Sequence, residues 1–191
     1  MKRLFLAAAL ALAATPALAE PVAYTIDPTH TQTTFSVDRF GFTTIFGAFT
    51  QAEGVIWLDE ANPANSRVEA TVKAASLTAG EPTRDDHLKG ANWLNVAAHP
   101  LITFKSTRTV PTGKDTADVT GDFTLNGVTK PVTFKVRLNK LGPAMGSGRP
   151  SAGFTITGEI VRADFGVSRA GGAIGDRVPV RIEVLAVAPA S

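Results

Sequence analysis

The sequence predicts an all-β protein built from antiparallel strands, with one short helix. Apolar and polar residues alternate with a period of two along most of the chain, as in strands that bury one face. An Asn-Gly pair joins two such segments, which is the strongest short signal for a β-hairpin. Only one segment carries the start and stop signals of a helix. A β-sandwich and an up-and-down barrel both fit this pattern.

The first residues have the pattern of a secretory signal. A short basic start precedes an apolar run over residues 4–14, and residues 17–19 (A-L-A) form a small-x-small cleavage site. We expect residues 1–19 to be a cleavable signal peptide and residues 20–191 to be a single domain. The apolar run is well short of the roughly 20 residues that a membrane-spanning helix needs. The sequence therefore predicts a periplasmic or secreted protein with no permanent membrane anchor.

The charge of the mature chain argues against nucleic acid as a partner. The full chain of 191 residues has 19 Lys and Arg against 17 Asp and Glu. Lys2 and Arg3 lie in the expected signal, so the remaining 17 basic residues balance the 17 acidic ones. A neutral chain with interspersed charges has no long-range field to gather phosphates. The absence of cysteine excludes disulfides, thiolate metal sites and a lipoprotein anchor.

Period-two segments predict about nine strands. The clearest are residues 118–125 and 132–139, where apolar Val, Phe and Leu alternate with charged and hydroxyl residues. Asn126 and Gly127 lie between them, so we expect one hairpin here. The other expected strands are residues 24–26, 33–37, 54–59, 67–74, 101–107, 153–161 and 178–187.

One segment, residues 83–94, departs from the β pattern. Thr83 is a suitable N-cap, and Asp85 and Asp86 carry negative charge where the first turn of a helix favours it. Gly90 is a suitable stop signal. We therefore expect a short helix in this segment.

Phenylalanines are concentrated near the start of the mature chain. Ten remain after removal of the signal, and five of them, at positions 35, 40, 42, 46 and 49, lie within fifteen residues. They form either an ordinary hydrophobic core or the wall of a cavity for an apolar ligand. Gly41 and Gly47 interrupt this segment and disfavour a regular buried strand, which supports the cavity for Phe40, Phe42 and Phe46.

Motifs for catalysis and metal binding are weak. The histidines His30, His87 and His99 form no H-x-H or H-x-x-x-H pair. No serine stands in a G-x-S-x-G motif, so no acyl-transfer nucleophile is predicted. The glycine-rich residues 171–176 lack the Lys-Ser/Thr ending of a phosphate loop, and we expect a turn or a loop at a barrel rim. The sequence therefore predicts no catalytic residue, no metal and no cofactor.

Six short motifs follow one another along almost the whole mature chain. They are an Asp-x-x-His opening with an F-x-V strand, a glycine-aromatic segment, a D-H-L helix, a P-x-I-x-F-x-S strand, a G-D-F-T-L-N-G hairpin and a closing pair, R-A-D-F-G with I-G-D. They occupy residues 24–37, 41–49, 86–88, 99–106, 121–130, and 162–166 with 174–176. Each motif alone is weak, but their order is specific. With them the chain resembles the YceI-like family of periplasmic lipid- and polyisoprenoid-binding proteins.

This resemblance implies an extended antiparallel, lipocalin-like barrel of about eight strands. Its lumen would hold a long isoprenoid or other lipid chain, with no catalytic role. The expected lumen residues are Phe35, Val37, Phe40, Phe42, Phe46, Phe49, Ile102, Phe104, Phe123, Phe134, Phe154 and Ile156.

Four residues are candidates for contacts to a polar head group: Asp27, His30, Arg39 and Asp86. Family members often have histidine where this chain has Arg39. A guanidinium there either pairs with an anionic head group or lies on the surface. Asp27 and His30 either hold a head group or stabilise the first turn through local hydrogen bonds.

The leading functional hypothesis is a periplasmic carrier for polyisoprenoids, isoprenoid quinones or related lipids. One alternative is an interaction or stress-response module with a filled core. A less favoured one is an enzyme acting on an apolar substrate, with His87, Asp85 or Asp86 as general acid or base. Exposed rim residues such as Trp93 are candidates for either an entrance or a homodimer contact.

Overall fold

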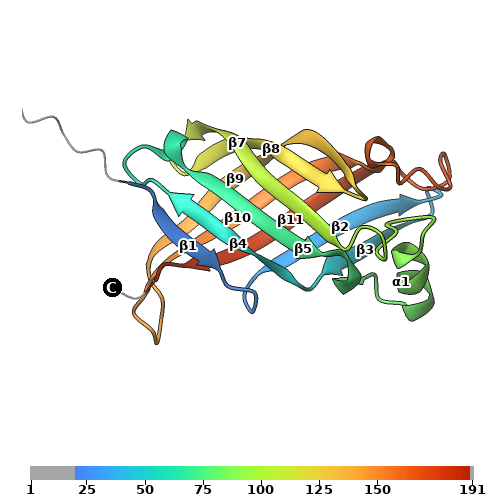
Figure 1. Ribbon diagram of the computed structural model, residues 1–191, viewed down its shortest axis with the longest axis horizontal. Helices are drawn as coiled ribbons and strands as arrows, with labels where there is room; N and C mark the ends of the chain where they lie inside the picture. Colours follow the sequence, from blue (N-terminus) through green and yellow to red (C-terminus); the bar gives the residue numbers. More distant parts are fainter. Residues whose placement is uncertain (1–19, 190–191) are drawn as a thin grey trace, which may run out of the picture.

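Eleven strands and one α-helix make up the computed structural model, which describes residues 20–189 (Figure 1). The helix, α1, spans Pro82–Lys89. The strands are β1 (Val22–Ile26), β2 (Gln32–Arg39), β3 (Thr43–Phe49), β4 (Ala52–Leu58), β5 (Arg67–Lys73), β6 (Leu77–Thr78), β7 (Leu101–Gly113), β8 (Thr116–Leu125), β9 (Val128–Pro143), β10 (Pro150–Val161) and β11 (Arg177–Val187). Three short 3-10 helices are η1 (Pro63–Asn65), η2 (Ala74–Ser76) and η3 (Arg162–Phe165). The expected signal peptide lies outside the described residues.

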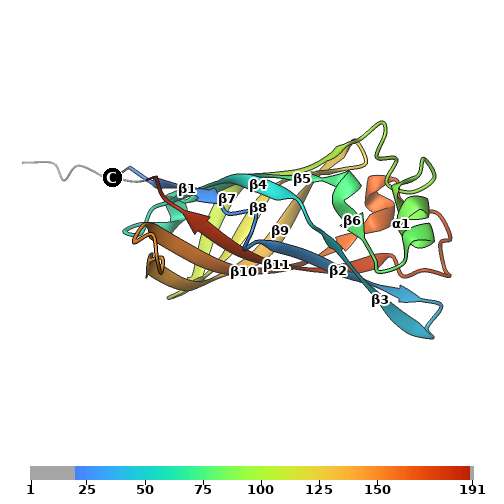
Figure 2. The ribbon, with the colours of Figure 1, turned by 90° about the horizontal axis from the view of Figure 1, so that it is seen from below.

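Eight of these strands close into an antiparallel ring. Their order is β1, β4, β5, β7, β8, β9, β10 and β11, and β11 pairs again with β1. This closure excludes a sandwich and confirms the predicted barrel of about eight strands. Two strands, β1 and β2, pair with the same edge of β11. Ala186 and Val187 pair with β1, whereas residues 180–183 pair with β2. The β2–β3 hairpin therefore continues the wall beyond the ring, and Figure 2 shows it projecting at the α1 end.

The expected strands are all present, and β3 and the two-residue β6 are additional. Asn126 and Gly127 join β8 to β9 with φ of 51° and 76°, and Leu125 pairs with Val128. Two positive φ values in a two-residue turn match the type I′ geometry that the Asn-Gly pair predicts. The sequence prediction missed β3 because its inward positions include Gly47 while Phe46 points outward, which reverses the usual pattern.

The helix begins one residue before the expected segment and ends at the predicted stop. Pro82 occupies the first helical position, where its fixed φ suits a helix and its missing N–H is not needed. The N-cap is therefore Glu81, not Thr83: its carboxylate accepts hydrogen bonds from the backbone N–H groups of Thr83 and Arg84 at 3.0 and 2.7 Å. Gly90 is the C-cap, as predicted. No helix within residues 20–189 is long and apolar enough to cross a membrane.

The core consists of two buried clusters. The first closes the barrel at the end opposite α1 and comprises Tyr24, Ile26, Ala152, Phe154, Val184, Ala186 and Ala188. The second packs around Phe134 and comprises Ala74, Ile102, Leu125, Phe134, Ile160 and Phe165. Among the described residues no large side chain is completely buried. In a filled barrel the large inward side chains would be completely buried, so the interior between the two clusters is hollow.

Candidate functional site

A cavity of about 630 Å³ runs through the barrel. This volume lies within the roughly 300–1,000 Å³ range of small-molecule sites. Its wall is mostly aliphatic and aromatic, and it includes residues from both sides of the ring and from the β2–β3 hairpin. Eight of the expected lumen residues line it: Phe35, Val37, Phe49, Ile102, Phe104, Phe123, Phe134 and Ile156.

Four other residues expected in the lumen do not line the cavity. Phe40, Phe42 and Phe46 are exposed, with 48%, 90% and 73% of their surface accessible. The prediction failed because β3 is a regular strand after all: Ile45, Gly47 and Phe49 face inward, which places Phe46 outside. Phe40 and Phe42 belong to the turn. Phe154 is buried in the cluster at the opposite end of the barrel and does not line the cavity.

Glycines under aromatic rings keep this interior open. A Cβ atom on Gly47 would lie 2.3 Å from the ring of Phe35, and one on Gly158 would lie 2.5 Å from the ring of Phe134. A Cβ atom on Gly121 would lie 2.6 Å from the ring of Phe104. Because these glycines have no side chain, the rings lie flat against the wall instead of projecting into the cavity.

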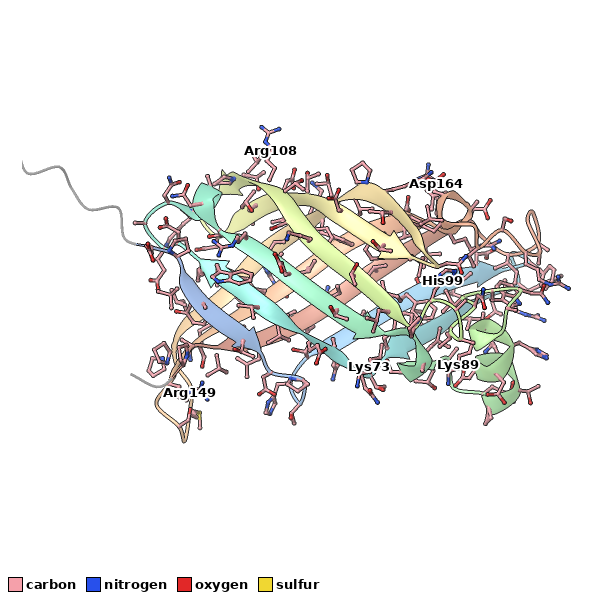
Figure 3. All side chains as sticks on the ribbon, in the orientation of Figure 1. Lys73, Lys89, His99, Arg108, Arg149 and Asp164 are labelled. Carbon is pink, nitrogen blue, oxygen red and sulfur yellow. The ribbon has the colours of Figure 1, made fainter. Side chains whose placement is uncertain are left out.

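The two ends of the cavity differ in polarity. Arg149, at the end opposite Lys89 of α1 in Figure 3, donates from Nε and Nη2 to the carbonyl of Ala188 at 3.0 and 2.6 Å. The buried apolar cluster around Phe154 lies at this end as well. Five charged side chains and one histidine of the wall lie instead at the α1 end, on β2, α1, η3 and their flanks: Asp38, Arg39, Glu81, Arg84, His87 and Arg162.

Arg84 contributes a hydrogen-bond donor that has no partner in the protein. Its Nη2 donates to the carbonyl of Ala79 at 2.5 Å, whereas its buried Nε makes no hydrogen bond to any described residue. Thr31 Oγ1 is the only other such buried side-chain atom within residues 20–189, and Thr31 also lines the cavity. A buried polar atom without a partner costs about 1–3 kcal/mol. Polar atoms of a ligand can supply the missing hydrogen bonds.

Glu81 and Asp85 hold α1 in place beside this mouth. Hydrogen bonds from the backbone N–H groups of Thr83 and Arg84 hold the pKa of the Glu81 carboxyl below its usual value, so the cap stays charged. Asp85 Oδ1 accepts from the backbone N–H of Ala79 at 2.6 Å and ties the helix to the end of β6. Arg84 and His87 thereby face the cavity from a fixed helix.

Arg162 organises the rim loop of residues 166–176. This buried guanidinium donates to the carbonyls of Val167, Arg169, Ile174 and Gly175 at 2.6 to 3.0 Å. It also lies 3.1 Å from a carboxylate oxygen of Asp176 and 6.0 Å from the ring of Trp93. The loop is thus at the barrel rim, as expected from the sequence, and Trp93 is a half-buried part of the cavity wall.

The other head-group candidates differ in position. Arg39 lines the cavity at its mouth, and its guanidinium lies 4.9 Å from the centre of the Phe40 ring. Asp27 and His30 lie away from the cavity and bond to each other at 2.7 Å, while Asp27 also accepts from the N–H of Thr29. The hydrogen bond with His30 lowers the pKa of Asp27. These two residues therefore stabilise the first turn, and Asp86 lies on the exposed side of α1 away from the cavity.

The described residues contain no group of three or more His, Cys, Asp or Glu side chains placed to hold a metal ion. The interior is also incompatible with the alternative of a filled core. Fold and site together define a hollow antiparallel barrel with an apolar cavity and one polar mouth.

The chain belongs to the YceI family, because residues 24–186 match the YceI-like domain model. It is 37% identical to Protein YceI of Escherichia coli O157:H7 over 155 residues, covering 81% of this chain and 80% of that protein. It is 36% identical to a UPF0312 protein of Azotobacter vinelandii, again over 155 residues that cover 81% of this chain and 80% of that protein.

Two solved structures show the same fold. BcnA of Burkholderia cenocepacia superposes with a TM-score of 0.76 at 22% identity, covering 84% of this chain and 98% of BcnA. A polyisoprenoid binding domain from Saccharophagus degradans, implicated in plant cell wall breakdown, gives a TM-score of 0.68 at 17% identity. It covers 88% of this chain and 99% of that domain.

Sequence reasoning missed Arg84 and Arg162 as parts of the mouth. Arg84 stands in the predicted helix, where nothing in the pattern indicates which side chains face the barrel. Arg162 had a signal: the motifs at residues 162–166 and 174–176 occur together, and the structure shows the guanidinium of the first bonding the backbone of the second.

Proposed function

We propose that this protein is a periplasmic carrier that holds the chain of a polyisoprenoid, an isoprenoid quinone or a related lipid in the barrel cavity. The observation that carries the proposal is the apolar cavity, which has a buried apolar cluster at one end and charged side chains at the other. Membership of the YceI family and the similar fold of a polyisoprenoid binding domain support it. The leader sequence supports export, and the proposed role is binding rather than catalysis.

The energetics of burial are sufficient for such a carrier. Each buried CH₂ contributes roughly 0.8 kcal/mol, so one five-carbon isoprene unit contributes about 3 to 4 kcal/mol. Association costs about 4 to 15 kcal/mol in lost freedom. A tail of several units therefore reaches micromolar affinity or better without any strong polar contact.

The polar mouth supports an amphiphilic ligand whose tail enters first. Arg84 and Arg39 place two guanidinium groups at the end of the cavity, and the Nε of Arg84 still lacks a hydrogen-bond acceptor. Guanidinium groups bind phosphate and carboxylate oxygens through charge-assisted hydrogen bonds. We assign these two residues to the head group of the lipid.

Native mass spectrometry of the protein purified from the periplasm, followed by organic extraction, tests the proposal directly. We expect a stoichiometric lipid mass and an isoprenoid chain in the extract. A protein that is free of lipid and also takes up neither a quinone nor a polyprenyl phosphate would contradict the proposal.

Two adjacent positions of β2 provide a matched pair of variants. Val37 lines the cavity, whereas Ser36 pairs with the outward-facing Phe46 and does not. Val37→Trp is expected to obstruct the mouth and reduce the retained lipid, while Ser36→Trp adds the same side chain outside and leaves lipid retention unchanged. Equal retention in both variants would place the lipid outside this cavity.

The head-group assignment has its own test. Arg84→Met is expected to weaken binding of a polyprenyl phosphate by about tenfold or more, the cost of one charge-assisted hydrogen bond. Binding of the polyprenol with the same tail should change little. Equal effects on both lipids would show that Arg84 acts through the structure of the mouth and not on the phosphate.

A further inference from the structure

The β2–β3 hairpin exposes an aromatic surface beside the cavity mouth. Phe40, Phe42 and Phe46, here called the aromatic tip, account for half of the six large apolar side chains that are exposed within residues 20–189. All three lie on one hairpin, which projects past the barrel (Figure 2). The inner side of the same hairpin carries Val37 and Ile45, which line the cavity. One β-ribbon thus has a cavity face and an aromatic outer face.

The turn that carries the aromatic tip is held by specific hydrogen bonds. Asp38 Oδ1 accepts from the N–H of Gly41 at 3.0 Å, and Phe42 N–H donates to the carbonyl of Arg39 at 3.1 Å. Phe40 N–H donates to the carbonyl of Ala173 in the rim loop at 2.8 Å. Phe40 has a φ of 57°, a conformation that large side chains rarely adopt. The exposed rings are therefore presented by a defined turn and are not a frayed end.

From these features we infer that the aromatic tip docks the protein on a lipid bilayer, with the mouth of the cavity facing the membrane. The inference deepens the proposed function and rests on it, because a carrier of a poorly soluble lipid must exchange that lipid with a membrane. Apolar side chains next to the mouth would enter the interfacial layer, which extends about 5–10 Å into the bilayer boundary. The Arg39 guanidinium, beside Phe40, is placed to meet lipid phosphates.

The size of the patch favours a membrane over a second copy of the chain. The exposed fractions of the three rings together correspond to about two complete phenylalanine side chains, or roughly 400 Å². A stable protein interface buries roughly 800 Å² on each partner. The tip supplies about half of that area on a narrow hairpin, whereas insertion into a bilayer needs only that the rings reach the acyl boundary.

Flotation of the purified protein with vesicles of phosphatidylethanolamine and phosphatidylglycerol, free of isoprenoids, tests the inference. The double variant Phe42→Ser with Phe46→Ser is expected to lose at least about tenfold in vesicle partitioning, because two rings no longer enter the bilayer. The matched control is Met145→Ser, which removes a fully exposed apolar side chain from the β9–β10 loop at the opposite end and should bind as the unchanged protein does. Thermal melting of each variant confirms folding.

A second variant reports the depth of insertion. The emission of the unchanged protein, which contains Trp57 and Trp93, is subtracted as the background. The additional emission of Phe42→Trp is expected to shift to shorter wavelength on vesicle addition and to be quenched by lipids brominated on the acyl chain. Unchanged emission of Trp at this position, with vesicles present in excess, would overturn the inference. So would a protein that does not float with vesicles, or a Met145→Ser variant that loses binding as the double variant does.

Light scattering after gel filtration tests whether a second copy of the chain, instead of a membrane, covers the aromatic tip. A dimer that becomes monomeric in the double variant, without vesicle binding, would show that a second copy covers the tip. Mass spectrometry of the same samples separates this inference from the carrier proposal. Vesicle binding without a retained lipid upholds docking alone, whereas a retained lipid without vesicle binding overturns docking alone.

Discussion

Replacing Arg162 by methionine tests the account of the cavity mouth most sharply. This residue is 5% exposed, and its guanidinium donates to four backbone carbonyls of the rim loop. Methionine preserves most of the apolar volume but removes every donor and the charge that faces Asp176. The carbonyls of the loop then need new partners, and only those that can turn toward water will find them.

The magnitude follows from those contacts. A buried carbonyl left without a partner costs about 1–3 kcal/mol. The hydrogen bond to Val167 is buried, whereas the other three are partly buried and their carbonyls recover part of their hydrogen bonding from water, so the expected total is about 3–5 kcal/mol. In a domain of this size that range corresponds to a Tm lowered by about 6–20 °C.

Urea unfolding and hydrogen exchange measure the global and the local effect. Arg162→Met should lower the urea midpoint. Relative to the unchanged protein, exchange of the amides of residues 166–176 should accelerate more than exchange of the amides in the ring strands β8 and β9. Arg162→Lys is the informative control, since an ammonium keeps the charge but cannot reproduce the planar fork that reaches four carbonyls. A lysine variant with unchanged stability and unchanged exchange in the loop would refute the reasoning.

Three further changes test other parts of the structure. Glu81→Ala removes the carboxylate that caps α1 and should lower the Tm by a few degrees in a thermal melt followed by circular dichroism. Acid should destabilise the protein through Asp59, because a hydrogen bond from Asn65 lowers the pKa of its carboxyl below the ordinary 3.8. As the pH falls, the unfolded chain takes up this proton before the folded chain does. The stability that Asp59 contributes is therefore complete above about pH 4 and is lost as the pH falls through the lowered native pKa. Urea midpoints measured between about pH 6 and pH 3 test this. Gly158→Ala puts a Cβ atom 2.5 Å from the ring of Phe134, which should cost about 1–3 kcal/mol in urea unfolding and narrow the cavity.

Each of these changes has a control. Glu81→Gln keeps an acceptor oxygen at the cap and should fall between the unchanged protein and Glu81→Ala; identical melts of all three would contradict the capping role. Asp59→Asn should flatten the acid part of the stability profile, and an unchanged profile would assign the acid sensitivity elsewhere. Gly153→Ala introduces the same methyl group where the nearest atoms lie 4.0 Å away, so a loss equal to that of Gly158→Ala would disprove the contact with Phe134.

Much of the ring was predictable from local sequence, because most of its strands bury one face and show the period of two. The turn at Asn126 and Gly127 was predictable for the same reason, since few residues tolerate two positive φ values in succession. Strand β3 was not predictable, because its inner side includes Gly47, where the ring of Phe35 takes the place of a side chain. In addition, the large apolar side chain of Phe46 in the same strand faces outward.

The candidate site was predictable only in part. Periodicity indicates which side chains point into a barrel, but not which part of the interior is filled. Phe134 and Phe154 both point inward, yet only Phe134 lines the cavity, because Tyr24 and Ile26 of β1 pack around Phe154. Whether they do so depends on where β1 joins β11, and that pairing connects the two ends of the chain.

Under the proposed carrier function, the hollow interior would link the lifetime of the protein to the supply of its ligand. A molecule that fills the cavity completes the core, and because it binds the folded state alone, it stabilises the fold by about 2.7 kcal/mol at a hundredfold excess over its Kd. Proteases attack chains that open, so loaded copies would persist while empty copies are removed. The abundance of such a protein would then follow the amount of lipid available to it, without any dedicated sensor or signal.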